Sequence, residues 1–427
     1  MRGAHALGSS CSLLSTKVRG LCRGYFEAAG FRNITVVEAA AQFAPLGVGL
    51  NILPSAAREL HALGILETLR SQSIETGALS LRNRWGTEIW TEARGLAAGY
   101  RWPQLSIQRK VLQQVLLDTL ILRLGKHVLL ENHELEFIDQ EGVGGVVAHF
   151  GNGRSIGCDL LVAADGIHSR VRSGMYPAEG EPVASGMRMF RGTTWSKPFF
   201  DGKTMAVMGD ARDRLVFYPI ARHPEREEQC LINWVACAPV ARSVRGQASW
   251  RRSVSSQIPV ELFSEWHVPW LDIQETMHRS VEVYEYPLVD RDPIAKWYDG
   301  NALLIGDAAH PMYPNGSNGA TQAIIDAREL VSQLTRARYV HSGIVRFQGA
   351  RIRKTTALQQ SNRERGPEAV ISLAHKRRPR GFSHVSEAFV EEELRTVSAR
   401  YARTGGLDVP AVNGQPSYKC MVEGASS

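Results

Sequence analysis

The sequence predicts an α/β fold in which a parallel sheet is interrupted by an antiparallel, β-rich insertion. Two apolar strands, at residues 158–163 and 302–305, are each followed within two residues by an aspartate, then by a turn and a helix. Between them, residues 186–287 carry short alternating segments that turn residues separate, as in an antiparallel sheet. The order is therefore α/β, then β-rich, then a final β–loop–α unit.

The remaining elements follow from hydrophobic spacing. Residues 34–38 (ITVVE) are a short β-branched run that ends in an acid, which is typical of a buried parallel strand. Residues 54–69 and 109–124 carry apolar side chains at helical spacing. Further expected elements are strands at 127–130, 135–138 and 145–150 and helices at 260–266, 319–334 and 386–403.

Composition excludes several classes of protein. The chain has 427 residues, of which 44% are hydrophobic and 22% charged, and no run approaches the ~18 apolar residues of a membrane span. None of the six cysteines forms a CxxC pair or a zinc-like spacing, so we expect free thiols and no metal. The net charge is +7, with bases concentrated at 346–365 and 375–380, but no nucleic-acid-binding module accompanies them. A solvated basic face that helps to attract anionic ligands is the simpler interpretation.

Residues 301–334 carry the strongest chemical signal. Gly306 and Asp307 end an apolar strand, where open α/β sheets bind ligands, and the carboxylate can accept from a sugar-like hydroxyl. A loop with two prolines and two glycines lets the backbone approach a planar ligand closely. The helix that begins near Gly319 would stabilise negative charge, such as that on the pyrimidine side of a reduced flavin. The alternative is an ordinary strand–loop–helix with a solvent-facing aspartate.

Residues 160–172 (LLVAADGIHSRVR) repeat this arrangement. Asp165 can accept from a hydroxyl or cap its turn, and Arg170 and Arg172 can meet a phosphate or lie on the surface. Glu38 ends its strand where an acid would take both hydroxyls of an adenosine ribose. Arg109 heads a helix, from which it can reach a cofactor phosphate or a flavin, or simply be a surface charge.

Together these segments resemble the FAD-dependent aromatic hydroxylases, the para-hydroxybenzoate hydroxylase superfamily. The stretch ADGIHSRVR at 164–172 is similar to the family's Asp-Gly motif, and GDAAHPMYPNGSNGA at 306–320 to its Gly-Asp motif. The resemblance runs from about Ala28 to about Pro416 and is strongest to the phenazine- and salicylate-hydroxylase-like subgroup. Supporting stretches are 49–65, 92–109, 191–205, 283–297 and 362–375.

The resemblance implies a glutathione-reductase-like, Rossmann-type FAD-binding domain interleaved with an antiparallel, β-rich substrate domain. The expected segments are 1–65 (FAD-binding), 66–106 (substrate domain), 107–180 (FAD-binding), 181–290 (substrate domain), 291–345 (FAD-binding, with the Gly-Asp motif) and 346–427 (C-terminal helices and tail).

It also implies residue roles. Glu38 would bind the ribose, Arg109 would lie near the isoalloxazine or pyrophosphate, and Asp165 would serve both FAD and NAD(P)H. Asp307, beside Gly306, would hold ribityl and pyrophosphate groups. Pro311 and Arg109 would stand at the reaction site. The backbone of Gly316, Ser317, Asn318, Gly319 and Ala320 would face the pyrimidine edge of the flavin.

The implied reaction reduces FAD with NAD(P)H, binds O₂ as a flavin C4a-hydroperoxide and transfers a hydroxyl group to an aromatic or polyketide-like small molecule. The expected protein is a monomer or homodimer in the cytoplasm. No strong general base is evident, and a structural role for His310 is at least as plausible as a chemical one. Aromatic candidates for the substrate pocket, each more often a core residue, are Trp195, Phe217, Tyr218, Trp234 and Tyr286.

The N-terminus departs from the family pattern. Gly3, Gly8, Gly20 and Gly24 do not form GxGxxG, and no apolar strand precedes them, so the first strand and the pyrophosphate cradle read as degenerate or missing. A mis-assigned or frame-shifted start, true divergence, and a mitochondrial transit peptide are the three explanations; the first 26 residues contain no Asp or Glu.

Two further functions stay open at this point. One is a catalytically impaired flavoprotein homologue that acts as a binding protein or is a non-functional product. The other is a flavin dehydrogenase or halogenase that hydroxylates nothing.

Overall fold

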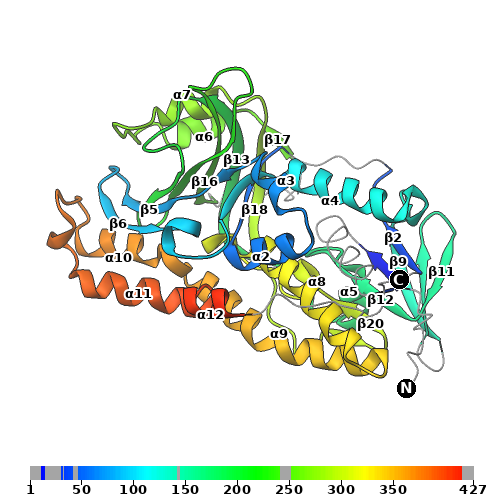
Figure 1. Ribbon diagram of the computed structural model, residues 1–427. Coiled ribbons are helices and arrows are strands. Elements are labelled where there is room, and N and C mark those ends of the chain that lie inside the picture. Colours follow the sequence, from blue (N-terminus) through cyan, green and yellow to red (C-terminus); the bar gives the residue numbers. More distant parts are fainter. Residues whose placement is uncertain are drawn as a thin grey trace, which may run out of the picture.

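The computed structural model describes residues 11–14, 30–31, 33–41, 47–141, 145–240 and 252–415. Figure 1 shows two main sheets with helices packed around both. The smaller sheet is mostly parallel, and the larger one is mostly antiparallel. Within the described residues, no helix combines the length and the apolar character that crossing a membrane requires.

The parallel sheet has six strands in the order β19-β20-β12-β1-β2-β8. Only the short edge pairing of β19 with β20 is antiparallel. The apolar runs at 34–37, 160–163 and 302–304 form its buried strands, as the sequence predicts. The strands are β1 (Cys11–Leu14), β2 (Ile34–Val37), β8 (Leu129–Leu130), β12 (Leu160–Ala163), β19 (Tyr298–Asp299) and β20 (Ala302–Leu304).

The sequence predicts that the first strand is degenerate or missing, and the structure shows that it is present. Strand β1 pairs in parallel with β2 on one side and with β12 on the other, with Cys11 opposite Ile34 and Leu160. A strand between two partners takes backbone hydrogen bonds from both, so four residues of modest β-propensity suffice. The degenerate glycine motif falls at residues 3–24 and, outside β1, lies beyond the described residues.

Helices cover both faces of the parallel sheet. The predicted helix at 54–69 is two helices, because Gly64 adopts a φ of +78° that ends the first one. The predicted helix at 109–124 has the expected bounds, and its apolar stripe is buried. The helices are α2 (Pro54–Ala62), α3 (Leu66–Arg70), α4 (Arg109–Leu124), α5 (Arg170–Met175), α8 (Gly319–Thr335) and α9 (Val340–Arg363).

The larger sheet has eight strands in the order β17-β18-β13-β16-β15-β14-β5-β6. Neighbours are antiparallel except β14 and β5. Helices α6 (Gln257–Leu262) and α7 (Ile273–His278) pack on one face around the core residues Phe217 and Trp234. The strands are β5 (Ala78–Asn83), β6 (Glu88–Ala93), β13 (Val183–Ser196), β14 (Thr204–Gly209), β15 (Arg214–Arg222), β16 (Cys230–Pro239), β17 (Arg252–Val254) and β18 (Val283–Asp290).

The C-terminal helices run beneath the larger sheet in Figure 1. Helix α10 (Ala369–Arg377) packs on β5 and β14, and α11 (Glu391–Thr404) contacts α9. Helix α12 (Val409–Gly414) follows. Two small antiparallel sheets complete the fold: β3 (Gly49–Ile52), β7 (Leu105–Gln108) and β4 (Ile74–Glu75), and β9 (Leu135–Glu141), β10 (Gly145–Phe150) and β11 (Ser155–Cys158).

This arrangement confirms the predicted α/β class with an interleaved antiparallel sheet. Residues 78–93 belong to the same sheet as residues 183–290, although a parallel-sheet segment separates them in the chain. The segment boundaries given above stay a prediction.

Candidate functional site

A cavity of about 470 Å³ lies where the two main sheets meet. Its size is within the range of small-molecule sites. One wall comes from the carboxyl ends of β12 and β20, through Gly166 and Asp307, and from the start of α4, through Arg109. The opposite wall is one face of the eight-stranded sheet. The cavity therefore joins the two motif segments with the β-rich insertion.

The Gly-Asp turn is fixed from behind by a buried aspartate. Strand β20 leads into a 3₁₀ turn, Gly306–Ala308, in which Gly306 has a φ of +56°. The Gly306 amide donates to Asp326 Oδ2 at 2.9 Å. Asp326 also contacts His310 Nε2 at 2.6 Å and accepts from Arg351 Nε at 2.7 Å. The contact with Asp326 gives His310 a structural role, the alternative that the sequence left open.

Neighbouring charges keep the buried Asp326 carboxyl group ionised. His310, Asp326 and Arg351 are all at most 5% exposed. Burial alone would raise the pKa of Asp326, but the His310 and Arg351 charges and the hydrogen bonds outweigh it and lower that pKa to about 2. Asp326 is therefore ionised at neutral pH and holds the turn, and Asp307 is presented to the cavity beside it.

The loop after the turn, residues 311–318, forms the edge of the cavity. Ser317, Gly319 and Ala320 line the cavity, whereas Gly316 and Asn318 do not, and the Asn318 side chain is fully buried. Helix α8 begins at Gly319, so its first N–H groups lie at the cavity. Pro311 is buried, its carbonyl accepts from Gln359 Nε2 at 2.9 Å, and it is not a lining residue.

The Asp-Gly turn reaches the same cavity from the neighbouring strand through Gly166, whereas Asp165 is not among the lining residues. Asp165 Oδ2 accepts from the Arg170 amide at 2.9 Å, and Gly166 has a φ of +84°. Asp165 Oδ1 is shielded from solvent and has no hydrogen-bond partner among the described residues. Burial raises the pKa of Asp165, more than its hydrogen bonds lower it. An acceptor without a donor at this position fits a ligand hydroxyl.

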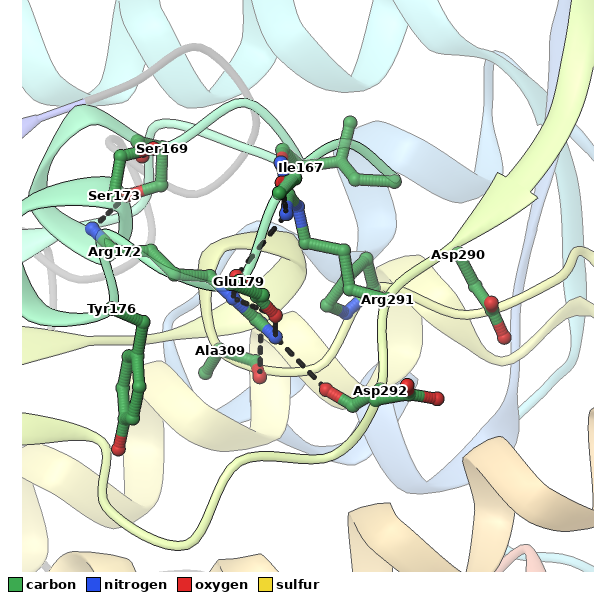
Figure 2. A network of polar contacts seen from close by, with 12 residues as sticks. Ile167, Ser169, Arg172, Ser173, Tyr176, Glu179, Asp290, Arg291, Asp292 and Ala309 are labelled. Atoms are coloured by element: carbon green, nitrogen blue, oxygen red, sulfur yellow. Dashed lines mark hydrogen bonds and ion pairs between the residues drawn. The ribbon is translucent and has the colours of Figure 1, made fainter. Parts of the chain in front are cut away.

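A buried arginine ties the two turns together, as Figure 2 shows. Arg172 is 1% exposed and donates to the carbonyl oxygens of Ala308 and Ala309 at 3.1 and 3.0 Å. It also pairs with Glu179, which Arg291 contacts at 3.1 Å. Arg172 therefore neither meets a phosphate nor lies on the surface, because its guanidinium is directed inward and fully used by protein acceptors.

Glu38 lies apart from the cavity. It follows β2, is 3% exposed, and accepts from the Ala40 amide at 2.9 Å through Oε1. It is not among the residues that line the cavity. The structure thus brings Arg109, Asp307, Ser317, Gly319 and Ala320 together, and leaves Glu38 at the end of a more distant strand of the same sheet.

The sheet wall of the cavity combines thioethers with charges. Of the five aromatic candidates, only Tyr218 lines the cavity, while Phe217 and Trp234 face the opposite core. Alternation in β15 explains this, since residues 214, 216 and 218 share one face. Further lining residues of this wall are Met187, Met189, Arg191, Met205, Val235 and Cys237.

The C-terminal segment adds a charged group to the cavity that the sequence did not predict. Glu368 lies 3.6 Å from Arg214, and both line the cavity. Burial raises the pKa of Glu368 and lowers that of Arg214, each partly offset by the opposite charge. Arg365 and Arg214 both donate to Ser372 Oγ, at 2.7 and 2.9 Å. In the sequence, the only indication that residues 362–375 belong to the site is their resemblance to the family.

The comparisons with known proteins agree with this geometry. The family model described as "FAD binding domain" matches residues 25–338, which is most of the chain. The chain belongs to this family. The predicted recognition as an FAD-dependent aromatic hydroxylase and the predicted FAD cofactor are confirmed, and the chain is an FAD-dependent monooxygenase.

Relatives with curated functions share much of the chain. Phenazine 1,6-dicarboxylic acid hydroxylase PhzS of Lysobacter antibioticus is 38% identical over 347 residues, which cover 79% of this chain and 85% of the relative. The 3-amino-4-hydroxybenzoate 2-monooxygenase PtnB3 of Streptomyces platensis is 29% identical, covering 78% and 82%. The 6-hydroxynicotinate 3-monooxygenase of Bordetella bronchiseptica is 28% identical, covering 71% and 76%. These relatives favour the enzyme over an impaired homologue.

Solved structures share the fold. Klebsiella pneumoniae HpxO complexed with FAD and uric acid superposes with a TM-score of 0.69 at 16% identity, covering 97% of this chain and 98% of that one. FqzB gives a TM-score of 0.72 at 16% identity, covering 97% and 93%. The predicted fold is therefore confirmed.

The residues present fit FAD. The Asp307 carboxylate at the cavity, and the unpartnered Asp165 oxygen next to the lining residue Gly166, supply acceptors for hydroxyl groups. The start of α8 supplies N–H groups for a negatively charged ring edge. The part of the chain that would carry a pyrophosphate cradle lies outside the described residues.

Proposed function

We propose that this protein hydroxylates an aromatic small molecule, with NAD(P)H as the reductant and O₂ as the oxygen source. The observation that carries the proposal is a cavity that joins the Gly-Asp segment to the face of the eight-stranded sheet. When bound, FAD supplies the redox chemistry and the activation of O₂. The protein has to hold the flavin, place the ring of the substrate beside it and exclude water.

The roles expected on the flavin side become part of this proposal. Asp307 accepts hydrogen bonds from the ribityl chain, Asp165 serves the cofactor and NAD(P)H, and Arg109 lies near the ring or the pyrophosphate. Glu38 binds the adenosine ribose at the end of β2. The backbone from Gly316 to Ala320 meets the pyrimidine edge, where the positive end of α8 stabilises negative charge.

Pro311 is proposed to shape the reaction site indirectly. It is buried and is held by Gln359, and the loop that follows it contributes Met312 and Tyr313 to the cavity. Pro311 would therefore set the course of the loop, while its neighbours contact the substrate.

The sheet wall supports an aromatic substrate that carries an acidic group. Arg191 and Arg212 line the cavity among methionine and valine side chains, which suits a flat apolar ring with a negative substituent, whereas Arg214 already faces Glu368. The names of the relatives are consistent with this, since two of them act on a phenazine dicarboxylic acid and an aminohydroxybenzoate.

Purification followed by flavin analysis and turnover tests the proposal. We expect yellow protein, or protein that takes up added FAD, and NAD(P)H oxidation that aromatic acids stimulate. The product should gain one oxygen atom, and ¹⁸O₂ should label it. Colourless protein that binds no FAD, or NAD(P)H oxidation that yields only hydrogen peroxide across a broad aromatic panel, would refute it. Dehydrogenated or halogenated product without ¹⁸O would favour the other flavin chemistries.

A further inference from the structure

Tyr401 lies behind the 311–318 loop and reaches it with its hydroxyl group. It belongs to the C-terminal helix α11 and is 6% exposed. Asn318 Nδ2 donates to Tyr401 Oη at 2.7 Å, and Tyr401 Oη donates to Asn362 Oδ1 at 3.3 Å. A side chain more than 80 positions away thus completes the hydrogen bonds of the loop.

The ring of Tyr401 fits between two glycines. A Cβ atom on Gly316 would lie 1.7 Å from Tyr401 Oη, and one on Gly366 would lie 2.8 Å from Tyr401 Cε2. Both glycines have positive φ, +69° and +51°. The backbone on each side therefore leaves room for this ring only because neither residue carries a side chain.

The loop needs such support because its backbone is strained. Gly316 and Ser317 are consecutive residues with φ of +69° and +59°, and Ser317 is not a glycine. Non-glycine residues persist in this conformation only where neighbours hold them. Asn318 holds the loop from within by donating to the Gly316 carbonyl at 3.1 Å, and Asn51 donates to Ser317 Oγ at 3.3 Å.

The two sides of the loop meet different partners. Ser317 and Gly319 line the cavity, whereas the Asn318 side chain is directed to Tyr401 on the opposite side. Burial raises the pKa of Tyr401, so the hydroxyl stays protonated and keeps both its donor and its acceptor role at neutral pH. A change at Tyr401 can therefore reach the cavity by two routes: through Asn318, and through Asn362, which donates to the Tyr313 carbonyl and accepts from Asn315.

We propose that Tyr401 is a positioning residue for the flavin: its hydroxyl fixes the 315–318 backbone against which the pyrimidine edge of the ring rests. This inference rests on the proposed function for where the flavin lies. It makes helix α11 part of the cofactor site, although the matched FAD-binding family model ends at residue 338.

The test is Tyr401→Phe, which keeps the ring between the glycines and removes only the hydroxyl. Apo-protein is titrated with FAD, and the absorption spectrum and reduction potential of the bound flavin are recorded. We expect FAD to bind about fivefold more weakly, the effect of one lost hydrogen bond between neutral groups. The flavin absorption bands and the potential should shift, because a loosened loop no longer presents its N–H groups in one geometry.

Tyr100→Phe is the matched control. Tyr100 donates to the Leu407 carbonyl in the same C-terminal region, and among the described residues no hydrogen bond joins it to the loop. It should leave FAD affinity, spectrum and potential unchanged. Any general loosening of the C-terminal helices would instead affect both variants equally, which would contradict the proposal.

A double-mutant cycle with Asn318→Ala tests the path. If Tyr401 acts through Asn318, the double variant should bind FAD no more weakly than the single variant with the lower FAD affinity. Additive losses would refute that path. If wild-type protein binds FAD and Tyr401→Phe has the same affinity, spectrum and potential, the role of Tyr401 is refuted and the proposed function is not. If wild-type protein binds no FAD, the proposed function itself is refuted.

Discussion

Arg172 donates a hydrogen bond to the carbonyl oxygen of Ala309 at 3.0 Å, although 137 positions separate the two residues in the chain. The bond joins the helix that follows the Asp-Gly turn to the segment that follows the Gly-Asp turn (Figure 2). Because β12 and β20 are adjacent parallel strands, this crosslink fixes the separation of Asp165 and Asp307 at their carboxyl ends.

Arg172→Ala should destabilise the protein by roughly 3 kcal/mol, because Glu179 loses its main partner and three carbonyl acceptors lose their donor. Urea unfolding measures this. The control is Arg170→Ala. The Arg170 side chain is 63% exposed, and at 4.0 Å from Glu134 its ion pair is long and weak. That change should stay within about 0.5 kcal/mol. Equal effects of the two substitutions would contradict the crosslink.

Asp165→Asn should affect stability and cofactor binding in opposite directions. The pKa of Asp165 is higher in the folded protein than in the unfolded chain. Ionising this carboxyl group therefore lowers the free energy of unfolding once the pH rises above the pKa of the unfolded chain. At pH 7 the neutral amide should therefore make the apo-protein more stable than wild type, and the gain should vanish at low pH. FAD should bind more weakly, because an acceptor for its hydroxyl is lost. Thermal unfolding of the apo-protein and FAD titration give the two readouts.

For Asp165→Asn, the decisive comparison is the sign of the two changes at pH 7. If the amide destabilises the apo-protein, or if FAD affinity is unaffected, then Asp165 Oδ1 does not await a cofactor group.

Asp326→Asn should alter the acid sensitivity of the protein. The pKa of Asp326 is depressed from 3.8 to about 2, so its contribution to stability is full above about pH 4 and is lost as pH falls toward 2. The shift corresponds to roughly 2 kcal/mol. Near neutral pH the variant should be less stable than wild type, since His310 and Arg351 lose their anion.

Urea unfolding of both proteins between pH 3 and pH 7 measures that difference. We expect the gap between wild type and Asp326→Asn to narrow below about pH 4. A gap that is constant with pH would show that Asp326 carries no depressed pKa.

Asp307→Asn should weaken FAD binding roughly tenfold or more, the effect of losing a hydrogen bond to a charged acceptor. The fold should change little, because Asp326 and Arg172 hold the turn. FAD titration and thermal unfolding measure the two properties. Asp299→Asn is a suitable control, since that side chain is 62% exposed on the edge strand of the same sheet. Unchanged affinity in Asp307→Asn would remove Asp307 from the site.

The parts of the site that the sequence predicted are those encoded locally. Asp307 and Asp165 could be placed because each directly follows an apolar run, and the carboxyl ends of parallel strands share one edge of a sheet. Arg109 could be placed because it begins a helix with a clear apolar stripe. The aromatic candidates were less informative, since only the strand pairing decides which face Phe217 or Tyr218 occupies.

The sequence by itself determined the fold class, the family and the two aspartate turns, because hydrophobic spacing and short motifs act over a few residues. Only the tertiary structure placed β1 in the centre of the sheet, directed Arg172 inward, and brought Glu368 and Tyr401 to the cavity wall and the loop. Those contacts join residues that are far apart in the chain. Their existence depends on how helices and sheets pack, and packing is a property of the whole chain and not of any local pattern.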